Sequence, residues 1–175
     1  PGPISSQTEQ DTRRFADFCR IPVFDPSSPE EAYKIIGESF EYSEKYNTPV
    51  LFRPTTRVCH AYASIDNCDS PSPKKYEGFV KDSKKWVIFP RLSFANHIMI
   101  EKRNVEIGKD FSTYSANKAE GVNSEKAVVT SGISYAYTKE CLKDFPDVKL
   151  IKIATAYPFP EDFVLSSLEG AKEVL

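Results

Sequence analysis

The sequence predicts an α/β protein built from parallel β-α-β units. Two observations lead to this fold class. Residues 21–24 and 48–52 are short apolar runs, and the segment between them has the length and spacing of a helix. Residues 127–130 and 148–154 repeat this arrangement around a second helical segment. Strands joined by one helix pair in parallel through a right-handed crossover, so each half of the chain predicts a small parallel sheet.

The composition fits a folded chain with a core of ordinary size. Of the 175 residues, 40% are hydrophobic and 27% are charged, which excludes a disordered, collagen-like or coiled-coil chain. The net charge of −2 argues against a nucleic-acid-binding protein, which is usually basic. No apolar run reaches the roughly 20 residues of a membrane span, and no signal peptide is visible. We therefore expect a cytoplasmic protein without a membrane partner.

A first helix is predicted over residues 7–19. Polar groups fill its opening turns, and Ser5 or Ser6 is the expected N-cap, at a helix end that also attracts anionic groups. Its apolar stripe consists of Phe15, Ala16 and Cys19.

The second helix begins with a capping box. Ser28 is the predicted N-cap, Pro29 suits the first helical position, and Glu31 at the third position completes the box. Asn47 is expected to end this helix, and residues 48–52 to form a buried strand. The predicted buried face consists of Ala32, Ile35, Ile36 and Phe40.

Residues 66–90 predict a linker. Residues 66–75 are polar and rich in proline, and the basic run of Lys81, Lys84 and Lys85 is interpreted as a solvated face in preference to a phosphate site. The next helix is predicted over residues 92–111. Its expected apolar side consists of Leu92, Ala95 and Met99.

The pattern is clearest after residue 126. Strand 127–130 leads through Ser131 and Gly132 into a helix, and strand 148–154 leads into another helix that opens at Pro160. We expect a further strand to be cut off after Leu175, and hence the chain to be a piece of a longer protein. The apolar sides expected of the two helices are Tyr137, Cys141 and Leu142, and then Val164, Leu165 and Leu168.

Residues 53–60 form the densest polar cluster. They directly follow a predicted strand, at the sheet edge where ligands bind in open α/β folds. Arg57 either pairs with a carboxylate or phosphate of a ligand or forms a salt bridge between domains. Neither His60 nor His97 has the partners of a nucleophilic triad, so we assign no catalytic residue. The turn from Ser131 to Gly132 is interpreted as a plain tight turn rather than as an anion site.

The four cysteines form no metal motif. Cys19, Cys59, Cys68 and Cys141 contain no C-x-x-C pair, so no metal site is predicted within this chain. Four cysteines in a chain of this length are not a disulfide scaffold, and we expect free thiols. A disulfide between Cys59 and Cys68 is disfavoured.

Four stretches carry a resemblance to a known family. They are PGPISSQTEQDTR at residues 1–13, PVLFRPTTRVCH at 49–60, GISY at 132–135 and YPFP at 157–160. In order and spacing they resemble motifs of the indolepyruvate:ferredoxin oxidoreductase alpha subunit, of the 2-oxoacid:ferredoxin oxidoreductase superfamily. The likeness covers nearly the whole chain. It departs from the family at Thr8, where an Asn is expected, and at Phe15, where a Tyr is common.

The resemblance implies a particular division of the chain. Residues 1–65 are expected to be the C-terminal part of a pyrimidine-type thiamine diphosphate domain, and residues 66–90 a linker. Residues 91–175 are then a transketolase-C-terminal-like domain with a parallel β-α-β fold. The resemblance places the segments that hold Mg²⁺, diphosphate and the iron–sulfur clusters outside this internal fragment, which alone is expected to bind no cofactor.

The same resemblance implies the function. The parent enzyme uses thiamine diphosphate, Mg²⁺ and iron–sulfur clusters to decarboxylate arylpyruvates oxidatively to aryl-acetyl-CoA, with coenzyme A as cosubstrate and ferredoxin as electron acceptor. Its expected partner is the beta subunit, in a hetero-oligomer. We expect the isolated fragment to be inactive. The residues that the resemblance places facing substrate or cofactor are Ser5, Ser6, Gln7, Thr56 and Arg57.

Two other interpretations remain open. The parent enzyme acts on pyruvate or another 2-oxoacid, or the chain is a non-catalytic α/β module that binds a partner through residues 126–175.

Overall fold

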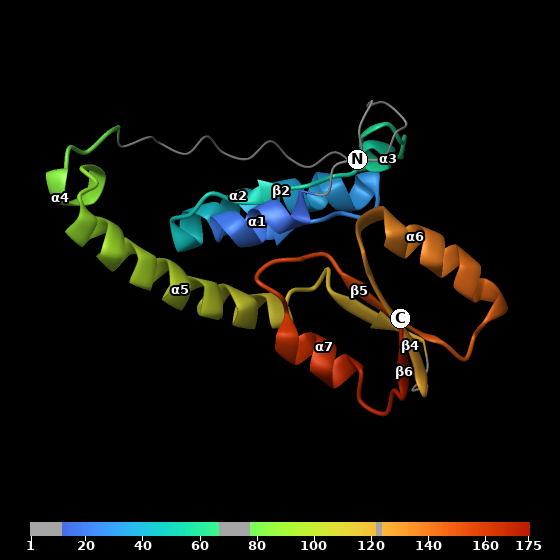
Figure 1. Cartoon of the computed structure of the whole chain (residues 1–175). Helices are drawn as coiled ribbons and strands as arrows, with labels where there is room; N and C mark the ends of the chain where they lie inside the picture. Colours follow the sequence, from blue (N-terminus) through green and yellow to red (C-terminus); the bar gives the residue numbers. More distant parts are fainter. Residues whose placement is uncertain (1–11, 67–77, 122–123) are drawn as a thin grey trace.

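A computed structural model of the chain describes residues 12–66, 78–121 and 124–175. Helices and strands alternate along most of the described chain (Figure 1). The predicted α/β class is therefore confirmed. No helix of the described residues is long and apolar enough to cross a membrane.

A two-stranded parallel sheet forms in the first part of the chain. β1 (Val23–Phe24) and β2 (Leu51–Phe52) pair in parallel, and α2 (Pro29–Tyr46) makes the crossover between them. The predicted β-α-β unit is confirmed. The prediction of a buried strand over residues 48–52 is wrong in extent and burial, since β2 has two residues and both are half-buried.

The capping box explains where α2 begins. The Ser28 hydroxyl accepts a hydrogen bond from the Glu31 backbone N–H at 3.2 Å. The Glu31 carboxylate accepts from the backbone N–H and the hydroxyl of Ser27, each at 2.7 Å, one residue before the N-cap N–H that the predicted box assigns to it. Asn47 ends the helix in the left-handed conformation, with φ 48°, which asparagine tolerates better than most residues.

A four-stranded sheet forms in the second part, in the order β3-β5-β4-β6. β4 (Lys126–Ser131), β5 (Lys149–Ile153) and β6 (Glu173–Val174) run parallel, and β3 (Lys118–Glu120) pairs with β5 in the antiparallel direction. In Figure 1 this sheet lies between α6 (Gly132–Cys141) and α7 (Glu161–Ser167).

One strand prediction needs correction. The sheet is mixed rather than parallel, because β3 joins it; a Lys-Ala-Glu stretch has no apolar run, so the sequence does not predict this strand. The further strand expected at the end of the sequence is present as β6, which begins at Glu173 and pairs with β4. The Val129 backbone N–H donates to the Leu175 carbonyl at 2.8 Å and extends this pairing.

One hydrophobic core serves both sheets. Its buried residues come from β1, α2, α5 (Pro90–Ser112) and the segment after β5: Phe24, Ile35, Ile107, Phe111 and Ala154. The rings of Phe24, Tyr42, Phe111 and Tyr114 pack with centroids 5.3 to 6.2 Å apart. The two-stranded sheet therefore packs against the C-terminal part of α5, the helix that follows the predicted linker.

The buried faces of the first two helices differ from the predicted ones. α1 (Arg13–Cys19) buries Ala16 but exposes Phe15 and Cys19, and the part of the predicted helix before residue 12 lies outside the described residues. α2 buries Ile35, whereas Ile36 and Phe40 are exposed. A helix with apolar residues on two sides buries the side that meets a neighbour, which its own spacing does not determine.

The later helices show the same difference. α5 covers the predicted residues 92–111, but its buried residues are Asn104, Ile107 and Phe111, and Met99 is exposed. On α6 both Tyr137 and Cys141 are exposed, and on α7 Val164 is buried while Leu165 is exposed. Together with α4 (Ser83–Trp86), the first half of α5 extends away from both sheets (Figure 1).

Candidate functional site

The carboxyl ends of four parallel strands meet at one place. Asp25 follows β1 and Arg53 follows β2, while Ser131 and Ile153 end β4 and β5. The Asp25 backbone N–H donates to the carbonyl of Ala154 at 2.7 Å, and the Arg53 N–H donates to that of Phe24 at 2.8 Å. The first bond brings the ends of the two sheets together, and the second continues the pairing of β1 with β2, at the edge where α/β proteins bind ligands.

Asp25 is the buried charge at this junction. Its side chain is 1% exposed and pairs with the Arg53 guanidinium at 3.0 Å, and the Arg53 Nε donates to the Thr12 hydroxyl at 3.0 Å. Burial raises the pKa of the Asp25 carboxyl, and the charges of Arg53 and Arg13 and the Ser131 hydroxyl oppose this shift. Asp25 Oδ2 has no hydrogen-bond partner among the described residues.

The Asp25 carboxylate contacts the first residue of α6. Gly132 has φ +51°, and a Cβ added there would lie 2.7 Å from Asp25 Oδ1 and 2.9 Å from Oδ2. A carboxylate at a helix N-terminus is favoured by the helix dipole. The chain's own aspartate thus occupies the position at the predicted turn that a bound anion would take, which agrees with the interpretation of Ser131 and Gly132 as a plain turn.

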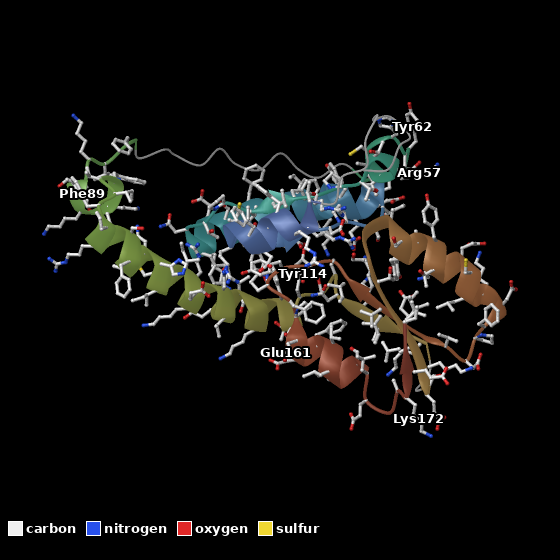
Figure 2. All side chains as sticks on the ribbon, viewed as in Figure 1. Arg57, Tyr62, Phe89, Tyr114, Glu161 and Lys172 are labelled. Carbon is white, nitrogen blue, oxygen red and sulfur yellow. The ribbon has the colours of Figure 1, made fainter. Side chains whose placement is uncertain are left out.

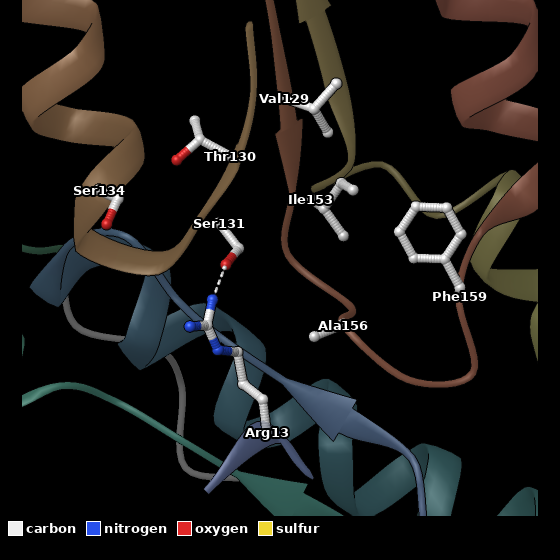
Figure 3. A pocket seen from close by; sticks show the side chains of 8 residues that line it. All are labelled: Arg13, Val129, Thr130, Ser131, Ser134, Ile153, Ala156 and Phe159. Atoms are coloured by element: carbon white, nitrogen blue, oxygen red, sulfur yellow. Dashed lines mark hydrogen bonds between the residues drawn. The ribbon is translucent and has the colours of Figure 1, made fainter. Parts of the chain in front are cut away.

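A cavity of about 290 Å³ opens at the carboxyl ends of β4 and β5, where Ser131 precedes this turn (Figure 3). Arg13 and Ser131 meet at its rim, where the guanidinium donates to the hydroxyl at 3.2 Å. The other lining residues are Val129, Thr130, Ser134, Ile153, Ala156 and Phe159. One cation and three hydroxyl groups on a partly apolar wall suit a small anionic or polar group.

The two predicted site residues that the structure describes do not line this cavity. Ser5, Ser6 and Gln7 lie outside the described residues. Thr56 and Arg57 open the short helix α3 (Thr56–Cys59); the Thr56 side chain is buried and Arg57 is exposed. Neither lines the cavity.

The salt bridge considered for Arg57 is not formed within the described parts of the chain. Arg53, four residues earlier in the same polar cluster, makes the ion pair instead. Sequence reasoning includes Arg53 only as part of that cluster and misses Asp25 and Arg13. An acidic residue directly after an apolar strand is the signal that identifies Asp25, but here the following prolines and serines indicate a helix start.

The histidine and cysteine side chains that the structure describes take no part in this junction. His60 is exposed at the end of α3, and His97 is exposed on α5 with its Nε2 3.7 Å from the Glu101 carboxylate. Cys19, Cys59 and Cys141 are free, and Cys68 lies outside the described residues. Within residues 12–66, 78–121 and 124–175, no group of three His, Cys, Asp or Glu side chains could hold a metal ion.

Fold and junction together define an α/β protein with polar groups gathered at the carboxyl ends of parallel strands. No protein-family model matches the chain. Among curated proteins, it is 34% identical over its whole length to the indolepyruvate oxidoreductase subunit IorA of Thermococcus kodakarensis and to that of Pyrococcus horikoshii. The same subunit of Methanothermobacter thermautotrophicus is also 34% identical over the whole chain. The chain is therefore homologous to part of IorA, as the sequence motifs predict.

The matched region is one part of a longer subunit. The chain spans 28% of the length of the Thermococcus and Pyrococcus proteins and 29% of the Methanothermobacter protein.

Proposed function

We propose that the chain is part of a thiamine diphosphate-dependent oxidoreductase that oxidatively decarboxylates arylpyruvates such as indolepyruvate, with ferredoxin as electron acceptor. The observation that carries this proposal is the homology to IorA along the whole chain at 34% identity. The names of these relatives supply the substrate and the reaction class. On its own the chain is expected to be inactive, because it corresponds to little more than a quarter of those subunits.

The division of the chain into domains follows the family resemblance. Residues 1–65 would complete a pyrimidine-type domain, and residues 91–175 would form the transketolase-C-terminal-like domain. The parallel pairing of β1 with β2 and of β4 with β5, together with the crossover helix α2, supports this assignment. The shared core around Phe24 and Phe111 means that the two units would not be independent.

Arg57 is the proposed substrate-binding residue of the described part. It lies on α3, the short helix that follows β2, it is exposed, and no described residue pairs with its guanidinium. A guanidinium binds a carboxylate through two parallel hydrogen bonds, so Arg57 would hold the carboxylate of a 2-oxoacid in one orientation. Thr56 precedes it in the same turn, and Ser5, Ser6 and Gln7 would face the same substrate from the N-terminal segment.

The ion pair at the junction would position both of these segments. Arg53 belongs to the loop that carries Arg57, and its Nε holds Thr12 at the end of the N-terminal segment. Asp25 fixes the Arg53 guanidinium from β1, and Arg13 ties the same segment to the end of β4. Geometry at a binding site depends on such supporting contacts, because small displacements of the binding groups weaken binding.

The parent enzyme's cofactors would be held by other parts of the protein. Within the described residues nothing forms a metal site, so the ligands of Mg²⁺ and of the iron–sulfur clusters are assigned outside them. Thiamine diphosphate, when bound, supplies the carbanion stabilisation that 2-oxoacid decarboxylation needs. The role left to this chain is to orient the substrate and exclude water.

The expected partners follow from the name of the relatives as a subunit. A beta subunit would complete the enzyme as a hetero-oligomer, coenzyme A would accept the acyl group, and the complex would act in the cytoplasm.

The test is made in the complete enzyme with its partner subunit. Arg57→Ala should raise the KM for indolepyruvate at least about tenfold, because the substrate carboxylate loses a charge-assisted hydrogen bond. The change in kcat should be smaller. Arg57→Lys keeps the charge but cannot form the two parallel hydrogen bonds. Its KM for indolepyruvate should therefore lie between those of Arg57→Ala and of the native enzyme.

Lys109→Ala is the control, because Lys109 is an exposed cation on α5 outside the site. Unchanged KM and turnover in Arg57→Ala would remove Arg57 from the site. Turnover of pyruvate with no turnover of indolepyruvate by the native enzyme would overturn the proposed substrate class.

A further inference from the structure

The cavity at the carboxyl ends of β4 and β5 has one polar side and one apolar side. Figure 3 shows the hydroxyl-bearing side chains of its wall on the same side as the Arg13 guanidinium: Thr130, Ser131 and Ser134. The other side is formed by apolar side chains, which are Val129, Ile153, Ala156 and Phe159. A ligand that fits this cavity therefore has a polar end and an apolar end.

Arg13 supplies the charge on the polar side. Among the described residues that line the cavity, Arg13 alone is charged. Its guanidinium donates to the Ser131 hydroxyl at 3.2 Å, which holds the cation at the end of β4. A guanidinium has five N–H donors, so it can bind a carboxylate in addition to this hydroxyl. The polar end of the ligand is therefore an anion.

The charges near Arg13 favour an anion with a single negative charge. The charge of Arg13 acts on the Asp25 carboxyl, so that carboxylate offsets part of the field of Arg13. Asp25 also pairs with Arg53 at 3.0 Å. Two guanidinium groups and one carboxylate leave one net positive charge, which matches a carboxylate better than a phosphate dianion. Asp25 in addition occupies the N-terminus of α6, where a phosphate would bind.

The size of the cavity limits the apolar end of the ligand. Its volume of about 290 Å³ lies at the lower limit of ligand pockets, which begin near about 300 Å³. Phe159 is 50% exposed and offers an aromatic ring to a ligand, while Ile153 is buried at 5% exposure and closes the wall. A single ring or a branched alkyl group is therefore the largest apolar end that we expect to fit.

Both parts of the chain line this cavity. Arg13 belongs to α1, whereas the other lining residues belong to β4, α6, β5 and the segment after β5. A ligand bound here would hold α1 against the four-stranded sheet. Arg57 lies on α3 at the surface of the molecule (Figure 2) and does not line the cavity. The cavity is therefore separate from the substrate site proposed at Arg57.

We propose that this cavity binds a small monocarboxylate whose apolar end is a single ring or a branched alkyl group. The Arg13 guanidinium pairs with the carboxylate, and the hydroxyl groups beside it donate hydrogen bonds to the same group. The apolar end packs between Ile153 and Phe159. This is a second acid-binding site, additional to the one proposed at Arg57, and its test does not depend on catalysis.

The probe for this site is 4-fluorobenzoate, a monocarboxylate with one ring. Its fluorine NMR signal is followed as the complete enzyme with its partner subunit is added. Every protein in the series carries Arg57→Ala, so that the proposed substrate site does not contribute. We expect a Kd of about 1 mM, an ordinary affinity for a ligand of about ten heavy atoms. The uncharged 4-fluorobenzamide should bind at least about tenfold more weakly, because it cannot form the ion pair.

Two substitutions locate the binding site. Arg13→Gln removes the cation and should weaken the binding of 4-fluorobenzoate at least about tenfold. Ala156→Leu places a larger side chain in the cavity and should weaken it by a similar factor, because the ring loses its space. The second substitution leaves the hydrogen bond between Arg13 and Ser131 in place, so it tests the cavity even if Arg13→Gln disturbs the fold.

Arg14→Gln is the matched control, because Arg14 is an exposed arginine of α1 that does not line the cavity. It should leave the Kd for 4-fluorobenzoate unchanged. The proposal would be overturned by the absence of binding at about 10 mM, by equal binding of 4-fluorobenzamide, or by unchanged binding in Ala156→Leu. Displacement of 4-fluorobenzoate by an equal concentration of inorganic phosphate would also overturn it, since the cavity would then be a phosphate site.

Discussion

Asp25 shows how one buried residue can connect several segments. Its carboxylate pairs with Arg53 and contacts Gly132, and its backbone N–H bonds to the segment after β5. A buried carboxylate is costly unless it is paired and hydrogen-bonded. Here the pairing is incomplete, because Oδ2 has no described partner, and burial raises the pKa of the group despite the two nearby arginines.

Gly132 cannot accept a side chain at this junction. Gly132→Ala places a Cβ within 3.0 Å of three carboxylate atoms of Asp25, at a positive φ that alanine adopts poorly. We expect the free energy of unfolding in urea to fall by about 2 to 3 kcal/mol. Gly37→Ala is the control: Gly37 lies within α2 with nothing within 4 Å of an added Cβ, so about 0.5 to 1 kcal/mol of stabilisation is expected. Equal effects of the two substitutions would contradict the close approach.

The raised pKa of Asp25 predicts a pH dependence. A carboxyl whose pKa is higher in the folded state than its ordinary 3.8 binds its proton more tightly when folded. Its contribution to stability is complete below pH 3.8 and is lost as the pH rises through the folded pKa. The native chain should therefore lose stability relative to Asp25→Asn over that window. The measurement is urea unfolding of both proteins at a series of pH values; a difference that rises with pH would mean that the arginines outweigh burial.

At the scale of elements, the sequence predicts best those helices and strands whose signals are local. The capping box at Ser28 places the start of α2, and the apolar runs place β1, β4 and β5. β3 is missed because its three residues become a strand only through pairing with β5. The buried faces of α2 and α5 are mispredicted because tertiary neighbours select among apolar stripes.

For the candidate site, too, the sequence predicts what is local and misses contacts between distant segments. Arg57 and Thr56 are found from a motif that is contiguous in sequence. Asp25, Arg53 and Ser131 come together from three different strand ends, and no local pattern links residues so far apart in the chain.

The capping box of α2 gives a prediction at this scale. Ser28→Ala removes the oxygen that accepts the Glu31 N–H, and we expect thermal unfolding to show a loss of about 1 kcal/mol. Ser93→Ala is the control, since Ser93 is exposed within α5 and its side chain makes no hydrogen bond with the described residues. A loss of similar size at Ser93 would mean that the cap contributes nothing specific.

At the scale of the molecule, buried contacts join what the sequence divides into two domains. The core contains Phe24 and Ile35 from the first part and Ile107, Phe111 and Ala154 from the second. A second link is the ion pair between Glu31 of α2 and Lys152 of β5, which is almost fully buried on the lysine side. Burial lowers the pKa of Lys152, while Glu31 opposes that shift. Separating the two sheets would expose apolar surface and leave an unpaired charge.

This coupling predicts that both sheets unfold in one cooperative transition. Phe111→Ala removes the ring that touches Phe24 and Tyr42, and a buried phenylalanine lost in this way costs about 3 to 5 kcal/mol. Although Phe111 lies on α5, hydrogen exchange should show that amides of β2 and of β4 lose protection together, by the same free energy. Leu165→Ala is the control, because Leu165 is 62% exposed on α7 and its truncation should change protection little. If β4 kept its full protection in Phe111→Ala while β2 lost its own, the two parts would be independent domains and the shared core would be a contact between them.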